Sequence, residues 1–113
     1  MPTLIDRQEA VARLGGDIAL LREVASIFLS VQDECLNELR TAAANHDLTT
    51  LSEAAHGLKG SVANFCATEA VSAAFAIERM GKRQPPPDSV EVEQALRTLE
   101  LALLALRPEL EKL

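Results

Sequence analysis

A histidine, a lysine and a glycine stand close together in the stretch HGLKG, at positions 56, 59 and 60. On a helix, residues three and four apart are neighbours, so Lys59 and Gly60 would both adjoin the imidazole of His56. The lysine cation would disfavour a second positive charge, which helps to keep His56 neutral and nucleophilic. The glycine would let another molecule approach the ring. This combination suits an anionic group, phosphoryl above all, that bonds to His56 and is steadied by Lys59.

The helix that carries these residues has one apolar side. At about 100° per residue, His56 lies roughly opposite the centre of that side, and we expect its ring to face solvent. The alternative is a slightly weakened helix whose polar face is merely solvated. The apolar side consists of Leu51, Ala54, Ala55, Leu58, Val62 and Phe65, and the other side of Thr49, Ser52, Glu53, His56, Lys59, Gly60 and Ala63.

The rest of the chain supplies further helices and no strand. We expect helices over about 6–14, 17–44, 47–65, 67–81 and 88–108. Aspartates at 6, 17, 47 and 88 are positioned to cap four of them, with Glu9 and Glu91 completing capping boxes. We expect Asn45 to take a left-handed conformation and Pro108 to end or kink the last helix. The expected fold is all-α, an antiparallel four-helix bundle with a short additional N-terminal helix.

Composition and charge limit the class of protein. The chain has 113 residues, of which 48% are hydrophobic and 3% aromatic, which favours a single helical domain over 1–113. Its net charge of −6 without a basic cluster argues against binding to nucleic acid or an anionic membrane. No apolar run approaches the ~20 residues of a membrane span, and no signal peptide is visible, so we expect a cytoplasmic protein. Cys35 and Cys66 are expected to be buried, reduced thiols.

Glu78 is the best candidate for a group that orients His56. If the helices on either side of 66–67 are antiparallel, position 56 lies opposite about position 77. Glu78 shares a face with the apolar residues Val71, Ala74 and Phe75, an unusual environment for a carboxylate. One interpretation is that it accepts a hydrogen bond from Nδ1–H of His56. The other is an edge glutamate whose carboxylate reaches solvent.

The stretch from His56 to Ala67, HGLKGSVANFCA, resembles the hallmark of the histidine-containing phosphotransfer (HPt) domains of two-component phosphorelays. The upstream stretch RLGGDIALLREVASIFL is similar to the family's Gly-Asp helix start leading to a core Phe, here Phe28. The resemblance implies a five-helix domain with a four-helix core. It also implies that His56 accepts a phosphoryl group from a receiver-domain aspartate and passes it to another. Lys59 would pair with phosphoryl oxygens and Gly60 would admit the receiver's loop.

The resemblance also implies partners and cofactors. The partners would be response-regulator receiver domains, a hybrid sensor histidine kinase, or both. Any Mg²⁺ would be held by the receiver, and we expect no metal or other cofactor on this chain, no autonomous kinase activity, and a monomer. One departure is Cys66, where the family usually has glycine. If that position needs a positive φ, cysteine adds strain on the order of 1 kcal/mol. If the glycine only lets two helices approach, cysteine is small enough.

Contact with a receiver would involve the neighbours of His56, namely Ser52, Glu53, Ala63 and Asn64. A second apolar stripe on the long helix, formed by Leu20, Ile27 and Val31, either packs under the first helix or offers a patch to a partner.

Other functions remain as alternatives. The chain could be the phosphoacceptor domain of a chemotaxis-type histidine kinase, with ATP as ultimate donor, or a noncatalytic helical interaction module. A metal site formed by His46, His56 and the cysteines has no recognisable ligand spacing. A hydrolase built on Ser52 or Ser61 lacks an orienting group and an oxyanion pocket.

Overall fold

The computed structural model describes residues 4–113 and contains five helices. Throughout this described part of the chain the regular structure is helical, with no strand, which confirms the predicted all-α class. The helices are α1 (Arg7–Arg13), α2 (Ile18–Ala44), α3 (Leu48–Ala63), α4 (Thr68–Met80) and α5 (Ser89–Glu111).

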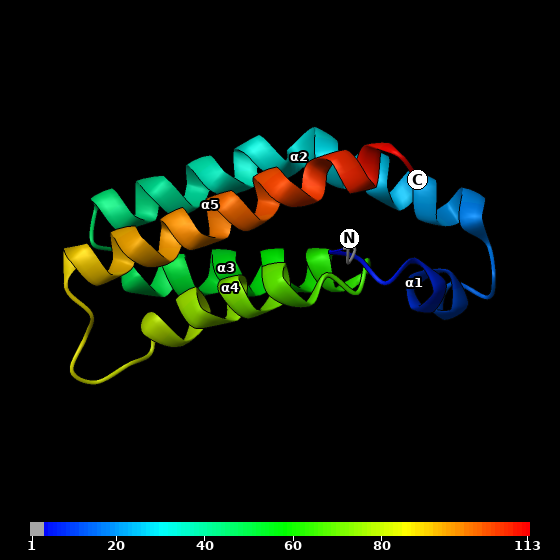
Figure 1. Cartoon of the computed structure of the whole chain (residues 1–113). Helices are drawn as coiled ribbons and strands as arrows, with labels where there is room; N and C mark the ends of the chain where they lie inside the picture. The colour runs from blue at the N-terminus through cyan, green and yellow to red at the C-terminus, as the bar shows by residue number, and fades with distance from the viewer. Residues whose placement is uncertain (1–3) are drawn as a thin grey trace.

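Helices α2 to α5 form an antiparallel bundle. Each of the four packs against two others, in the ring α2–α3–α4–α5, and Figure 1 shows α2 and α5 lying together above α3 and α4. The N-terminal part of α2 extends beyond the bundle, and α1 lies at that end. The bundle is closed there by Glu109, whose carboxylate accepts hydrogen bonds from the backbone N–H groups of Leu4 (2.9 Å) and Ile5 (3.2 Å).

Helix starts lie where the aspartates predict them. The side chains of Asp6, Asp17, Asp47 and Asp88 each accept a hydrogen bond from the backbone N–H three residues on, which satisfies a donor that the helix leaves open. Only α5 shows the full capping box, because Glu91 also accepts from the backbone N–H of Asp88. Helix α4 follows Ala67 and has no side-chain cap.

The expected left-handed conformation of Asn45 and the expected end of the last helix at Pro108 are both wrong. Asn45 has φ −87° and is the C-cap residue of α2, and the left-handed residue is His46, with φ +52°, because the chain reverses one residue further on. Pro108 lies inside α5, which continues to Glu111. Its ring removes one backbone donor in the last turns, on the solvent side of the helix where Leu104 is also exposed, so water can satisfy the carbonyl that is left free.

The interior of the bundle follows the apolar stripes, with some corrections. Val92, Leu96, Leu99, Leu103 and Leu106 of α5 are all buried, as their spacing predicts. On α2 the stripe passes through Gln32, a residue that the apolar pattern does not include. It is 5% exposed, and its side-chain oxygen has no hydrogen-bond partner among residues 4–113.

The apolar stripe of Leu20, Ile27 and Val31 does not pack under α1. These side chains are 39%, 59% and 38% exposed. The short α1 lies at the tip of α2 and leaves this face open. The interpretation as packing is therefore wrong, and the stripe is an exposed apolar face.

The two cysteines are free and half-buried, rather than fully buried as expected. Burial raises the pKa of the Cys35 thiol, and the neighbouring carboxylates of Glu38 and Glu34 raise it further. Cys66 has φ +52°, so the turn between α3 and α4 does need the left-handed conformation that glycine adopts without strain.

His46 and Cys66, the two described residues other than glycine with a positive φ, give a stability prediction. We expect His46→Gly to raise the free energy of unfolding by about 1 kcal/mol, because the exposed His46 side chain contributes little packing and glycine removes the strain. Cys66→Gly should gain less, since the thiol packs against the core. Urea unfolding measures both. Asn45→Gly is the control, because its φ of −87° is unstrained, and a stability gain there equal to that of His46→Gly would contradict the explanation.

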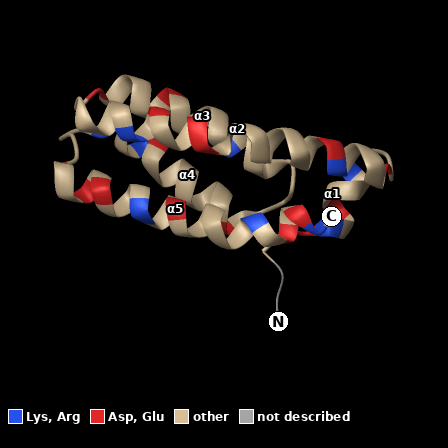
Figure 2. Ribbon diagram, turned by 90° about the horizontal axis from the view of Figure 1, so that it is seen from above, with Lys and Arg blue, Asp and Glu red and all other residues tan. Residues whose placement is uncertain are grey.

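Charged residues of both signs are distributed over the bundle. Figure 2 shows acidic and basic residues interspersed along the helices. No helix within residues 4–113 combines the length and the hydropathy that crossing a bilayer requires.

Candidate functional site

His56 lies in the middle of α3 and faces outward. Its side chain is 70% exposed. The apolar side of α3 explains this position, because Leu51, Ala55, Leu58 and Val62 are buried in the bundle on the opposite side. The imidazole is therefore accessible to a second molecule.

The carboxylate of Glu78, on α4, contacts the imidazole ring of His56. Its Oε1 and Oε2 lie 3.1 Å and 3.3 Å from Nδ1 of His56, so the carboxylate can accept a hydrogen bond from Nδ1–H. Glu78 is only 7% exposed. The structure thus brings together His56 and Glu78, which is one residue from the position that the turn at 66–67 predicts to be opposite, and the alternative of a glutamate that extends into solvent is wrong.

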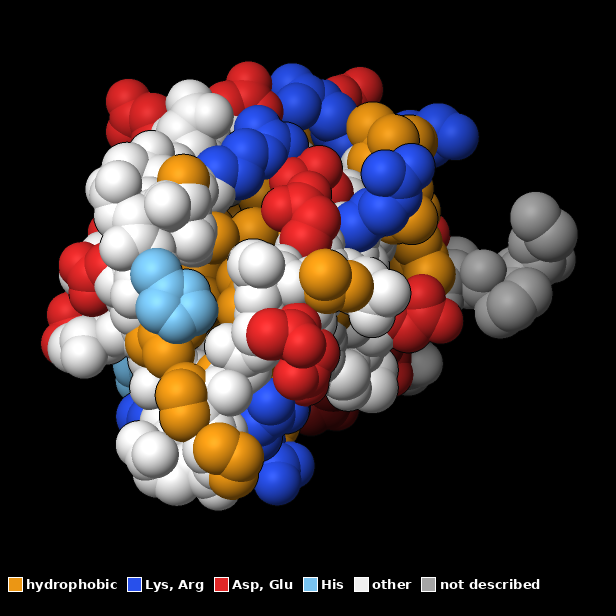
Figure 3. Space-filling model, turned by 90° about the vertical axis from the view of Figure 1, so that its left-hand side faces the viewer, with side chains coloured by type: hydrophobic (Ala, Val, Ile, Leu, Met, Phe, Trp, Pro, Cys, Tyr) orange, Lys and Arg blue, Asp and Glu red, His pale blue; other side chains and the backbone are white. Residues whose placement is uncertain are grey.

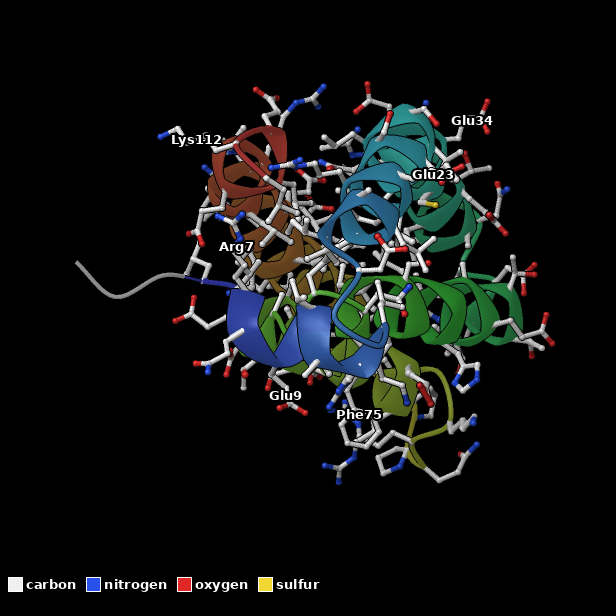
Figure 4. All side chains as sticks on the ribbon, turned by 90° about the vertical axis from the view of Figure 1, so that its right-hand side faces the viewer. Arg7, Glu9, Glu23, Glu34, Phe75 and Lys112 are labelled. Carbon is white, nitrogen blue, oxygen red and sulfur yellow. The ribbon has the colours of Figure 1, made fainter. Side chains whose placement is uncertain are left out.

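Lys59 completes a chain of three charged or polar groups. Its Nζ lies 2.7 Å from Oε1 of Glu78, and its side chain is 26% exposed. The ammonium also lies 4.7 Å from the centre of the Phe75 ring, and the guanidinium of Arg79 lies 5.6 Å from the same ring. Phe75 projects outward from α4 in Figure 4 and is 44% exposed. An aromatic ring beside two cations keeps the lysine close to the site.

The electrostatics of the site centre on Glu78. The hydrogen bond from Lys59 lowers the pKa of this carboxyl below its usual value, and His56 lowers it further, while burial acts in the opposite direction. The carboxylate is therefore ionised at neutral pH. An ionised acceptor beside Nδ1 favours the tautomer with the proton on Nδ1, which leaves the lone pair of Nε2 free toward solvent.

This carboxylate gives a pH prediction. Because the pKa of Glu78 is lower in the folded chain than its ordinary value of 4.5, its contribution to stability is complete above that value and is lost as the pH falls through the folded pKa. We expect Glu78→Gln to be less stable than the wild type at about pH 6, with the difference in Tm shrinking toward about pH 3. Thermal unfolding by circular dichroism measures this. A difference in Tm that is constant over this range would contradict the role of the charge.

Two glycines beside His56 face open space. A Cβ built at Gly57 or Gly60 would meet no atom of residues 4–113 within 4 Å, apart from the chain neighbours and the helix's own backbone. The fold itself therefore does not require glycine at either position, and a helix with alanine there would be more stable. The bare surface next to the imidazole is available to a partner.

Ser52 is not on the wet side of α3 as expected. It is 4% exposed, and its hydroxyl donates a 2.8 Å hydrogen bond to the backbone carbonyl of Glu78. The end of α4 covers it, because Gly81 allows that end to approach α3 closely. Of the other neighbours expected around the histidine, Glu53 and Asn64 are exposed and Ala63 is half-buried.

Neither a patch of one charge in the view of Figure 3 nor a metal-ligand cluster among residues 4–113 accompanies this site. In the view of Figure 3, acidic, basic and hydrophobic side chains alternate over short distances. Among residues 4–113 no three His, Cys, Asp or Glu side chains gather in a way that could hold a metal ion. His46 lies in the α2–α3 turn, at the end of α3 away from the α3–α4 turn that holds Cys66.

Comparison with known proteins identifies the family. The Hpt domain family model matches residues 23–110, a segment that includes all of α3 and α4. No curated protein and no solved structure matches the chain. Because the family match covers most of the sequence and spans the exposed histidine and its neighbours, this chain belongs to the Hpt domain family, whose members serve phosphotransfer in two-component signalling.

Proposed function

We propose that this chain is a phosphorelay intermediate in which His56 accepts a phosphoryl group from a receiver-domain aspartate and passes it to another receiver aspartate. The observation that carries the proposal is the exposed imidazole with a buried carboxylate at Nδ1. Catalysis of such a transfer depends mainly on position and charge compensation, and both are available in this arrangement.

The step balances without a separate base. The lone pair of Nε2 attacks phosphorus, the bond from phosphorus to the aspartyl oxygen breaks, and the aspartate leaves as a carboxylate. The proton on Nδ1 stays in place throughout, hydrogen-bonded to Glu78. The phosphorylated ring then carries a positive charge, which the Glu78 carboxylate compensates. Transfer onward is the same displacement in reverse, with a second receiver aspartate as nucleophile.

Lys59 would divide its charge between Glu78 and the phosphoryl group. At rest its ammonium lies 2.7 Å from Glu78 and above the Phe75 ring. Because Lys59 is one helical turn from His56, a rotation of its flexible side chain brings Nζ to the phosphoryl oxygens. Mg²⁺ would be supplied by the receiver, where it neutralises the other oxygens of the phosphoryl group.

The receiver would dock over Gly57 and Gly60 and extend to the apolar face of α2. The contact between Phe28 and Phe65, with ring centres 5.8 Å apart, fixes the register of α2 against α3. In this register Val31 is level with about residue 62, roughly 9 Å along the helix axis from His56. A receiver domain is wide enough to cover both. Open glycines and a modest apolar patch with polar neighbours suit a transient contact.

The partners would be receiver domains of response regulators or of a hybrid sensor histidine kinase, and the reaction would take place in the cytoplasm.

The experiment mixes the chain with a receiver domain that carries a labelled phosphoryl group. We expect an acid-labile label on the chain, mapped by mass spectrometry to His56. A label obtained from ATP alone, without a receiver or kinase, or no label from any of several receivers, would contradict the proposal.

A further inference from the structure

Helix α5 has a second face with the spacing of a coiled coil. Its inner face packs in the bundle at positions 92, 96, 99, 103, 106 and 110. Its outer face repeats the same spacing of four and three at Val90, Gln94, Arg97, Leu101, Leu104 and Pro108, all of them exposed. Val90, Leu101 and Leu104 make this outer face partly apolar, with the polar residues Gln94 and Arg97 between them, so it can meet a second partner while the inner face stays in the bundle.

The centre of this outer face is apolar. Leu101 is 57% exposed and Leu104 is 66% exposed, the largest value among the exposed large hydrophobic residues. No charged residue occurs from 101 to 106, the stretch LALLAL. Exposed leucines one turn apart, in a helix that is otherwise well supplied with charges, indicate a surface that is covered in the functional molecule.

The two flanks of this face differ. On the α4 side lies a groove of about 640 Å³, lined by small residues that include Ala73, Ala76 and Ala105. A leucine side chain from a second helix fits beside such residues. On the α2 side the flank is charged. It carries Glu100, which pairs with Arg40 at 2.8 Å, and Arg107, which pairs with Glu111 at 3.0 Å.

These flanks determine which orientation a second α5 would adopt. In an antiparallel pair with Leu101 opposite the second copy's Leu104, residues of the same flank face each other, so Glu100 lies opposite Arg107 of the other copy, and this happens twice by symmetry. In a parallel pair Arg107 would instead face Lys112. The antiparallel arrangement joins opposite charges and the parallel arrangement joins like ones.

In place of the monomer expected from the resemblance, we propose that two copies of this chain associate through the outer faces of α5, antiparallel, about a two-fold axis between Leu101 and Leu104. This face is self-complementary in its leucines and in its charges, as a symmetric dimer requires. A contact made by one helix per copy is at the small end of specific interfaces, so the dimer is weak and reversible, with a Kd on the order of 100 µM.

The dimer leaves both histidines accessible. Helix α5 contacts α2 and α4, whereas His56 lies on α3, diagonally across the ring. Two copies would therefore present two independent phosphoacceptor sites in one particle. Dimerisation and phosphotransfer can then be measured separately, and one can fail without the other.

Sedimentation equilibrium of the full chain from about 10 µM to about 1 mM tests this proposal. We expect Leu101→Glu and Leu104→Glu each to raise the Kd by at least about 30-fold, because each places a charge in the contact twice. Val90→Glu is the control on the same helix and seam. Val90 lies roughly 19 Å along the helix from the two-fold axis, outside the contact of the leucines, so the Kd should not change. A monomer throughout, or an equal effect of Val90→Glu, would overturn the proposal.

Charge reversal tests the orientation without disturbing the leucines. Glu100→Arg and Arg107→Glu should each weaken the dimer by about tenfold, and the double variant should restore the wild-type Kd. All variants are compared by circular dichroism to verify that they fold, and their phosphotransfer rates should match the wild type. A double variant no tighter than the two single ones would overturn the antiparallel pairing.

Discussion

His56→Gln should abolish acceptance of a phosphoryl group from a phosphorylated receiver, with a fall in transfer rate of at least about 10⁴-fold. Glutamine keeps the polarity and approximate reach of the side chain, but its amide nitrogen has no available lone pair for attack on phosphorus. The side chain is 70% exposed, so the substitution removes the nucleophile and little else. Rapid-quench transfer from a labelled receiver measures the rate.

The matched control is His46→Gln. His46 is also an exposed histidine, at the α2–α3 turn, and its loss should leave the transfer rate unchanged. An acid-labile label that persists on the His56→Gln variant would exclude His56 as the only acceptor. Urea unfolding should place the stability of His56→Gln within about 0.5 kcal/mol of the wild type, which separates loss of chemistry from loss of fold.

Much of this site is predictable from the sequence because it depends on local rules. Four aspartates mark four helix starts, and each of them caps its helix in the structure. The period of the apolar residues in α3 predicts an outward His56. The turn at 66–67 then predicts that about position 77 of α4 lies opposite, and in the structure the neighbouring Glu78 meets the ring.

The remainder of the site depends on how closely the helices approach one another, and this distance cannot be predicted from the sequence of any one helix. A helical wheel assigns Ser52 to the wet side of α3, but in a four-helix ring each helix is covered on two flanks, and α4 buries Ser52. The sequence likewise gives Lys59 no partner within the chain. In the structure Glu78 lies in the α3–α4 interface, and its carboxylate pairs with Lys59. In the sequence, Gly81 indicates only that a helix ends there, and nothing indicates that it lets α4 pack closely against α3.

Gly81→Ala should destabilise the fold by about 2–4 kcal/mol, the largest loss that we expect from any single methyl group in this chain. Gly81 has φ −64°, which alanine tolerates, so the reason is steric. An added Cβ would lie 2.5 Å from the backbone oxygen of Leu48 and 2.5 Å from Cβ of Ser52. Neither is the end of a flexible side chain, so α4 would have to move away from α3.

That displacement would also affect the site. The hydroxyl of Ser52 donates a hydrogen bond to the backbone carbonyl of Glu78, and the carboxylate of Glu78 is hydrogen-bonded to Nδ1 of His56. We therefore expect Gly81→Ala to slow phosphotransfer even at temperatures where it is folded. The matched control is Gly60→Ala, in which the same methyl group meets open space and should stabilise α3 by up to about 1 kcal/mol. Urea unfolding of the two variants should thus give changes of opposite sign. If Gly81→Ala were as stable as the wild type, the close approach of α4 to α3 at Gly81 would be contradicted. The buried position of Glu78 beside His56 would then be contradicted as well.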